Sequence, residues 1–186
     1  CQPSHDLNVI HVACGRGMNA LVDVAGEVLL WKWEEKVEAD EEKKEEEEKE
    51  EGNLKLARKH GMMRFSKLLT ACKLVAKEVA CGSSFIMVLT ESGQLASAGD
   101  SPKYLGREGN HEVLTLLDKI SNVTAIGCGD EHTLCALKGG FTMAWGSNEH
   151  SQLGIGTTRT FVATPTECHP GPTFVALSAN ASMSFG

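Results

Sequence analysis

The chain has few aromatic residues and few prolines: aromatics make up 5% of its 186 residues, with five prolines and one tyrosine. No apolar run approaches the roughly twenty residues that a membrane-spanning helix needs. The first residues, CQPSHDLN, lack the charged and apolar segments of a secretion signal. The apolar fraction of 41% is ordinary for a globular protein, so we expect one sizeable core and no membrane partner.

The sequence also lacks the local motifs that mark many catalytic and cofactor sites. It contains no Walker-type phosphate loop, no complete G-x-G-x-x-G, no G-x-S-x-G and no H-E-x-x-H. Its seven cysteines include no C-x-x-C pair, which argues against a zinc site or a disulfide ladder. We therefore expect no cofactor, no metal and no catalytic residue, and a reducing compartment, cytoplasmic or nuclear.

Charge of one sign gathers in a single segment. The net charge is −7, from 25 acidic and 18 basic residues, and Glu34 to Glu51 alone holds twelve acids and four lysines, a net of −8. The remaining 13 acids and 14 bases lack the broad basic footprint of a nucleic-acid binder, so a nucleic-acid partner is not supported. We expect residues 34–53 to form an acidic disordered insertion, the alternative being an arm that captures a basic partner.

The sequence does contain an internal repeat. Three Cys-Gly pairs align without gaps, each with a glycine twelve positions and a Trp or Ala seventeen positions after the cysteine, and a fourth copy places Ala179-Asn180 in the same position. The cysteine-to-cysteine spacings are 67 and 47 residues, with 51 more to Ala179, near the period of propeller blades. We expect repeats at about 7–33, 74–120, 121–170 and 173–186 of a single unit spanning 1–186.

The third copy resembles the regulator of chromosome condensation repeat family, whose signature W-G-x-N-x-x-x-Q-L-G-x-G it carries from Trp145 to Gly156. The second copy keeps only Ala98-Gly99, and the first keeps Trp31. The resemblance implies an all-β fold, a partial β-propeller of about three blades and the start of a fourth. The predicted structural-repeat residues are Cys14, Gly15, Gly26, Trp31, Cys81, Gly82, Gly93, Gly99, Cys128, Gly129, Gly140, Trp145, Gly146, Asn148, Gln152, Leu153, Gly154, Gly156 and Asn180.

Alternating and continuous apolar runs between glycine turns predict the strands. The first two copies are expected to contain strands at Val9–Cys14, Ala20–Val24, Val28–Trp31, Leu74–Cys81, Phe85–Thr90 and Leu95–Ala98, and the third to repeat this order from Val123. Outer strands are expected at Phe65–Leu69, His111–Leu117 and Phe161–Thr164, the first having a free amphipathic helix as its alternative.

Two sets of residues carry specific expectations. Gly15, Gly82, Gly129 and Asn180 share one repeat position and are expected to adopt positive φ, which Gly and Asn tolerate best. His132 lies near Cys128 and Cys135 and could serve as a general base or metal ligand, but its repeat equivalents are Met18, Phe85 and Met183. A position that accepts apolar residues favours a packed histidine; likewise, the aligned cysteines read as small buried residues.

The family resemblance implies a protein-interaction module within a larger regulatory protein, such as a giant ubiquitin ligase or a kinase. The partner would be a protein, for example a small GTPase or a ubiquitin-pathway component. The alternative is guanine-nucleotide exchange on a Ran-type GTPase, the activity of the family's founding member, and a third hypothesis is an enzyme site at His132. The chain begins at Cys1 and is expected to be a fragment whose apolar Val175 and Leu177 invite self-association or a partner strand.

Overall fold

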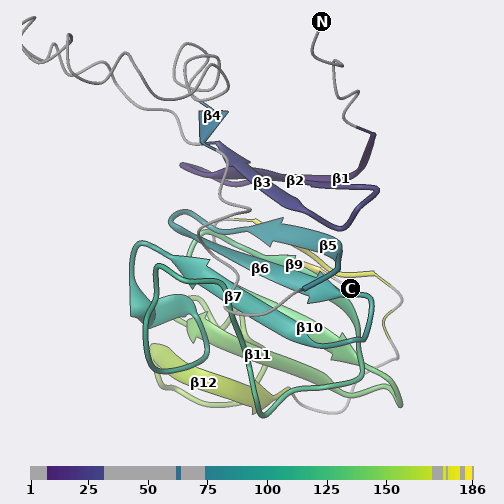
Figure 1. Ribbon diagram of the computed structural model, residues 1–186. Helices are drawn as coiled ribbons and strands as arrows, with labels where there is room; N and C mark the ends of the chain where they lie inside the picture. Colours follow the sequence, from purple (N-terminus) through teal and green to yellow (C-terminus); the bar gives the residue numbers. More distant parts are fainter. Residues whose placement is uncertain are drawn as a thin grey trace, which may run out of the picture.

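The computed structural model describes residues 8–31, 62–63, 74–168, 174, 176–180 and 183–185. These residues form antiparallel β-sheets that follow one another along the chain, together with one short 3₁₀ segment at Pro102–Tyr104 (Figure 1). The acidic insertion expected at 34–53 and the outer strand expected at Phe65–Leu69 lie outside the described residues. Within the described part, no helix is long and apolar enough to cross a membrane.

The first sheet contains β1 (Val9–Cys14), β2 (Asn19–Asp23), β3 (Val28–Trp31) and β4 (Met62–Met63), in that order. The turn between β2 and β3 is closed by the Asp23 carboxylate, which accepts hydrogen bonds from the Ala25 and Glu27 amides, both at 2.9 Å. Gly26 completes this turn with φ +74°, a conformation that residues with a Cβ rarely adopt. The glycine predicted from the repeat therefore lies in the turn that joins the second and third strands.

The other sheets repeat this order. The second contains β5 (Ala76–Cys81), β6 (Phe85–Thr90), β7 (Leu95–Gly99) and β8 (Thr115–Leu116). The third contains β9 (Val123–Cys128), β10 (His132–Leu137), β11 (Thr142–Ser147) and β12 (Phe161–Glu167), and the last described pair is β13 (Ser178–Ala179) with β14 (Ser184–Phe185).

Two predicted outer strands differ from the structure. The strand expected at His111–Leu117 is reduced to Thr115–Leu116. The strand expected to end at Thr164 instead continues through Pro165 to Glu167. Proline is tolerated there because β12 is the outermost strand of its sheet, and because the register shifts between the pairs of Ala144 and Gly146, so the missing N–H breaks no regular ladder.

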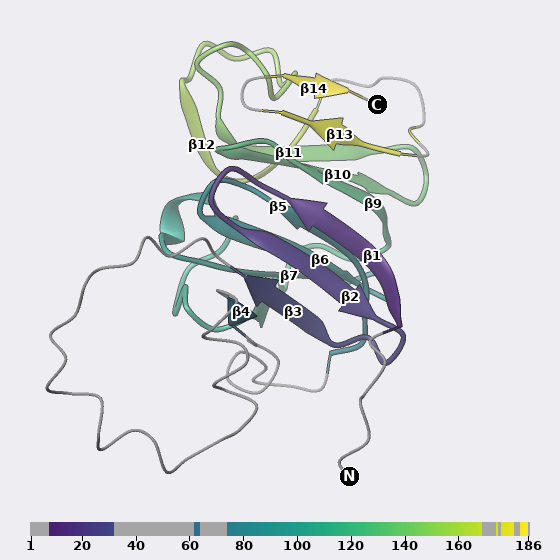
Figure 2. The ribbon, with the colours of Figure 1, turned by 90° about the horizontal axis from the view of Figure 1, so that it is seen from above.

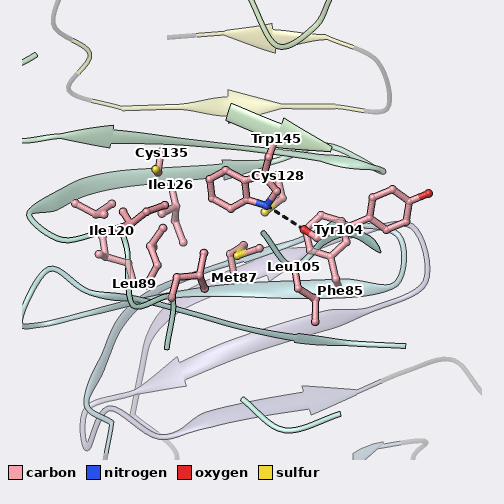
Figure 3. Close-up of a cluster of buried hydrophobic side chains, with 13 residues drawn as sticks. Phe85, Met87, Leu89, Tyr104, Leu105, Ile120, Ile126, Cys128, Cys135 and Trp145 are labelled. Atoms are coloured by element: carbon pink, nitrogen blue, oxygen red, sulfur yellow. Dashed lines mark hydrogen bonds between the residues drawn. The ribbon is translucent and has the colours of Figure 1, made fainter. Parts of the chain in front are cut away.

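The core lies between the sheets and not within any one of them. All six residues of β6 are buried, because alternate side chains point to opposite faces of the sheet and both faces are covered. Ile86 and Val88 pack with residues of the first sheet. Phe85, Met87 and Leu89 pack with the third sheet (Figure 3). The sequence of a strand covered on both faces is therefore a nearly continuous apolar run.

The first strands of successive sheets lie side by side, so that β1 contacts β5, β5 contacts β9 and β9 contacts β13 (Figure 2). Backbone hydrogen bonds also tie the start of a first strand to the turn between the second and third strands of the preceding sheet: the Ala76 amide donates to Gly26 O at 3.0 Å, and the Val123 amide donates to Gly93 O at 2.9 Å. The same contact recurs once per repeat. The predicted all-β architecture is confirmed as a partial β-propeller of three four-stranded blades and two strands of a fourth.

Candidate interaction surface

The longest described loops lie at one end of the blades. The first and third strands of each blade run in the same direction, so the turns 15–17, 82–84 and 129–131 share this end with the loops 100–114 and 148–160. We call this surface the loop face. The opposite end carries the short turns between the second and third strands. Loops held on a rigid scaffold are where binding residues concentrate, which makes the loop face the candidate site.

The four positions aligned on Gly15 share a hydrogen bond but not the predicted backbone conformation. Each amide donates to the carbonyl three residues on, at 2.8 Å for Gly15 and Gly82, 2.9 Å for Gly129 and 3.0 Å for Asn180. None of the four has positive φ, so that prediction is wrong. What the structure requires at the glycines is space for their neighbours.

A Cβ at each of these glycines would collide with an adjacent group. At Gly15 it would meet the Gly82 carbonyl, and at Gly129 it would meet both the His132 ring and the Asn180 carbonyl. These turns therefore sit in backbone contact with the next blade. Glycine is selected by close approach between blades, not by a left-handed turn.

Arg107 fixes the loop 100–114 from within. Its guanidinium donates to Ser97 Oγ at 3.0 Å and to the carbonyls of Ser97 and Val113 at 2.8 and 2.9 Å. It also reaches the carbonyls of Asn110 at 2.9 Å and Glu108 at 3.2 Å. Burial lowers the pKa of this guanidinium. Sequence reasoning missed Arg107, because its partners are backbone carbonyls that no residue pattern reveals.

Asn148 plays the same part in the loop 148–160. Its side-chain amide donates to the carbonyls of Arg159 at 2.8 Å and Thr157 at 3.3 Å, and its Oδ1 accepts from the Leu153 amide at 3.1 Å. Gln152 Oε1 accepts from the His150 amide at 2.9 Å. The side chains of the Asn and the Gln of the repeat signature therefore hold the backbone of their own loop by hydrogen bonds.

Leu153, the residue after the Gln of the signature, is buried in the core and is 1% exposed. Gly154 and Gly156 then turn the chain, each with φ +63°. Of the remaining predicted repeat residues, Gly99 ends β7, Gly146 lies in β11, and Gly93 and Gly140 are positive-φ turn residues. Trp31 ends β3.

An aromatic cluster joins the two long loops. Trp145 is fully buried and its Nε1 donates to the Tyr104 carbonyl at 3.0 Å, as Figure 3 shows. The Tyr104 ring stacks on Phe85 with 5.7 Å between centroids and meets Phe161 edge-on at 6.2 Å. Lys103 Nζ lies over both outer rings, 5.0 Å from the Tyr104 centroid and 4.9 Å from that of Phe161.

Two carboxylates act electrostatically on this lysine. The pKa of Lys103 is raised, first by its hydrogen bond to the Tyr104 hydroxyl at 3.3 Å, and further by Glu131 and Glu149. Burial raises the pKa of Tyr104, with Glu131 beside its hydroxyl acting in the same direction. Glu131 and Glu149 are exposed. The loop face thus carries exposed charged groups beside an aromatic cluster that is mostly buried.

Polar contacts link the turns between the first and second strands of the three blades. The Ser83 amide and hydroxyl both donate to the Asp130 carbonyl, at 2.9 and 2.7 Å. The Arg16 guanidinium lies 3.8 Å from the Asp130 carboxylate, and Arg16 is 80% exposed, so this ion pair contributes little to stability. Its position matters more, because it adds a cationic group to the same face.

His132 is a packed strand residue, as its repeat equivalents predict. It is fully buried, and its Nε2 lies 2.9 Å from Ser184 Oγ, which donates to the Gln152 carbonyl at 2.9 Å. Because the serine proton goes to Gln152, Nε2 must carry the imidazole proton and donate. Nδ1 is buried without a hydrogen-bond partner, and burial lowers the pKa of the ring, opposed by Asp130. Nε2 is hydrogen-bonded to Ser184, so neither ring nitrogen is open to solvent.

The described cysteines do not form a ligand set. Cys14, Cys81, Cys128, Cys135 and Cys168 are free thiols, and no group of three or more potential metal ligands occurs among the described residues. Burial raises the pKa of Cys135 to about 12. Cys168 donates to the Leu153 carbonyl at 3.3 Å, and His169 lies outside the described residues. The expectation that aligned cysteines are buried holds for Cys81 and Cys128 but is wrong for Cys14, which is exposed.

Successive four-stranded sheets around one axis, with loops gathered at one end, define a β-propeller repeat protein. Curated relatives carry the same repeat. The chain is 28% identical over 155 residues to E3 ubiquitin-protein ligase HERC2 of Mus musculus, covering 81% of this chain and 3% of that protein. It is 29% identical over 167 residues to the RCC1 domain-containing protein RUG3, mitochondrial, of Arabidopsis thaliana, covering 84% and 34%.

A third relative, Regulator of chromosome condensation of Drosophila melanogaster, is 32% identical over 87 residues, covering 43% of this chain and 16% of that protein. These relatives support the resemblance of the chain to the regulator of chromosome condensation repeat family. No protein-family model matches it. It spans about a third or less of the length of these relatives.

Solved structures show the same fold. Yeast RCC1 (Prp20) bound to Kap60 superposes with a TM-score of 0.68 at 18% identity, over 96% of this chain and 41% of that chain. Human WBSCR16 superposes with a TM-score of 0.67 at 21% identity, over 95% and 44%. Prp20p from Saccharomyces cerevisiae, which binds Gsp1p and histones, superposes with a TM-score of 0.66 at 14% identity, over 95% and 42%.

Proposed function

We propose that the chain is a non-enzymatic protein-interaction module, a propeller scaffold belonging to a larger regulatory protein such as a giant ubiquitin ligase. The observation that carries the proposal is the construction of the loop face. Arg107 and Asn148 each hold a long loop through several hydrogen bonds, while Glu149 in the loop 148–160 and Glu131 in the turn 129–131 remain exposed. Ordered loops that present charged groups favour docking of a partner at little entropic cost.

The partner is expected to be a protein with cationic groups opposite Glu131 and Glu149. Exposed charged groups beside the buried Tyr104 ring and the half-buried Phe161 ring match the polar rim of transient protein interfaces. Association should weaken with salt, because the carboxylates are exposed and screened. The free thiols agree with a reducing compartment, cytoplasmic or nuclear.

Site-specific photo-crosslinking tests this proposal. A photoreactive amino acid at Glu149, on the loop face, should capture a defined partner, and unlabelled chain should compete. The matched position is Lys138, an exposed residue on the opposite turns. We expect capture from position 149 only, reduced by the charge reversal Glu131→Lys. Equal capture from position 138 would contradict the assignment of the loop face.

The alternative function is guanine-nucleotide exchange on a Ran-type small GTPase, which the resemblance to this family suggests. Release of fluorescent GDP from such a GTPase distinguishes the two functions. We expect no acceleration by this chain at micromolar concentration, because the three complete blades present only part of a propeller face. Acceleration by a monodisperse preparation would replace the scaffold proposal with the exchange proposal.

A further inference from the structure

The ammonium group of Lys103 lies over two aromatic rings at once. Its Nζ is 5.0 Å from the ring centroid of Tyr104 and 4.9 Å from that of Phe161. The two rings are inclined to each other by 70°, so both faces are turned toward the same cation. Aromatic faces turned toward one point are a means by which proteins recognise ammonium ligands. The two rings therefore have the form of a binding site that a side chain of the same loop occupies.

Polar groups complete this site. The Tyr104 hydroxyl accepts a hydrogen bond from Lys103 Nζ at 3.3 Å and is itself hydrogen-bonded to Glu131. The pKa of Lys103 is raised by the hydrogen bond first, and then by Glu131 and Glu149. Hydroxyl and carboxylate oxygens accept from an ammonium group that carries protons, whereas a trimethylated ammonium has none to donate. The site therefore suits an unmodified lysine side chain.

The rings are held in place without Lys103. Tyr104 stacks on Phe85, with 5.7 Å between ring centroids, and its carbonyl accepts from Trp145 Nε1 at 3.0 Å. Phe85 and Trp145 are fully buried, and Phe161 is the first residue of β12. In Figure 3 the Tyr104 hydroxyl points away from the buried cluster. Removal of the Lys103 side chain should therefore leave both rings where they are.

Lys103 itself is held weakly. It is exposed, and its hydrogen bond to the Tyr104 hydroxyl is long. Arg107, on the same loop, donates instead to the Ser97 hydroxyl and to four carbonyls. An exposed cation over aromatic rings gains little from the contact, and a lysine side chain has many other rotamers to adopt. Because an exposed side chain reaches both rings, a ligand can approach them from solvent along the same path.

We propose that Lys103 is a built-in substitute for a lysine of the protein partner, and that the partner lysine binds over Tyr104 and Phe161 when Lys103 moves aside. The inference rests on the proposed function for the existence of a partner, and it names the group that the loop face recognises. A tethered occupant competes with every incoming ligand, so Lys103 keeps the affinity for isolated lysines low. A partner that also contacts the rest of the loop face overcomes this competition, which discriminates against other lysine-rich proteins.

Tyr104 is the only tyrosine of the chain, so an isotope-labelled tyrosine reports on this site alone by NMR. The probe is N-α-acetyl-lysine methylamide, titrated into the natural chain and into Lys103→Ala. We expect the dissociation constant to be about tenfold lower in Lys103→Ala, because the tethered competitor is gone. Lys103→Arg should bind the probe no better than the natural chain, since a guanidinium also stacks on aromatic rings. Both variants change an exposed side chain and should fold, which circular dichroism can establish.

The matched control is Lys138→Ala, which removes the same charge from the opposite turns and should bind like the natural chain. In the Lys103→Ala background, Phe161→Leu should abolish binding by removing one ring, and Glu131→Gln should weaken it by removing a carboxylate. The trimethylated probe should bind less tightly than the unmodified one, because it donates no hydrogen bond.

Three results would overturn the inference: Tyr104 signals in Lys103→Ala that do not respond to the probe, an equal gain in Lys138→Ala, or a preference for the trimethylated probe. The titration needs no partner, whereas photo-crosslinking from position 149 needs no lysine probe. Failure of the titration therefore leaves the proposed docking on the loop face standing, and failure of crosslinking is recognised separately.

Discussion

The imidazole of His132 lies directly against Gly129, leaving no room for a Cβ at that glycine. Phe85 lies against Gly82 in the same way in the preceding blade. In both blades the glycine amide also donates to the carbonyl of the residue whose ring covers it. The ring and the glycine thus form one structural unit that recurs with different chemistry, apolar in one blade and titratable in the next.

Gly82→Ala should destabilise the fold through this contact. The new methyl group would overlap the Phe85 ring, which is fully buried and cannot move outward. We expect the free energy of unfolding to fall by about 3 kcal/mol, the upper range for overpacking a core. Denaturant titration measures it.

The control for this change is Gly154→Ala. Gly154 has φ +63°, and a Cβ added there would have no neighbouring atom within 4 Å, so the substitution costs backbone strain alone, about 1 kcal/mol. If Gly82→Ala proved no more harmful than Gly154→Ala, close packing would not be the reason for glycine at position 82.

Stability should fall in mild acid because of His132. Its folded-state pKa is lowered by burial, so the unfolded chain binds a proton below about pH 6.5 that the folded chain does not. The contribution is therefore constant above that pH and is lost as the pH falls toward the folded-state pKa. Each such proton gives a slope of up to about 1.4 kcal/mol per pH unit.

His132→Phe should flatten this dependence between pH 7 and pH 5, since phenylalanine already occupies the equivalent position at residue 85. The variant loses the hydrogen bond to Ser184, so its stability at neutral pH need not equal that of the natural chain. Substitution of the exposed His150 by Gln serves as the control. An unchanged slope in His132→Phe would assign the acid sensitivity to other groups.

Arg107→Ala should loosen the loop 100–114. It removes hydrogen bonds to the Ser97 hydroxyl and to four backbone carbonyls. We expect the free energy of unfolding to fall by about 2 kcal/mol, because partly buried acceptors are left unpaired. Hydrogen exchange at the amides of this loop should accelerate. The charge-matched control is Arg159→Ala, at an exposed position on the other long loop. If Arg159→Ala accelerated exchange in the loop 100–114 as much as Arg107→Ala does, Arg107 would have no specific role there.

Removal of residues 34–51 should leave the fold intact. The segment has a net charge of −8, so its excision changes the net charge from −7 to +1. Its composition offers almost nothing to a core. Thermal unfolding measures the outcome, and a midpoint lowered by more than about 5 °C, roughly 2 kcal/mol at this size, would show that the segment contributes to stability.

The repeat made most of the fold predictable. The glycine turns and apolar runs placed β1, β3 and β6 at their observed bounds, because strand ends coincide with residues that break a ladder. The outer strands were harder. Pro165 marks a break in most strands, but it is tolerated in β12 because that strand is at an edge, which the sequence alone does not reveal.

The site was less predictable, because its geometry depends on contacts between repeats. The alignment identified Gly15, Gly82 and Gly129 as equivalent, yet it could not distinguish a left-handed turn from close packing, since both select glycine. The alignment did identify His132 as a packed residue. It gave no indication of Arg107 or Lys103, whose neighbours come from backbone groups and from another blade.

Because every hydrophobic cluster draws its members from two adjacent sheets, the smallest portion able to fold contains two neighbouring blades. A lone blade would present an apolar layer on each side and have no interior of its own. Gene duplication can therefore lengthen such a protein only when the added copy matches both of its neighbours. Recombination should therefore yield a folded protein when a blade is exchanged together with a neighbouring blade. The unit that such exchange must keep intact is the contact between two blades, more than the single blade.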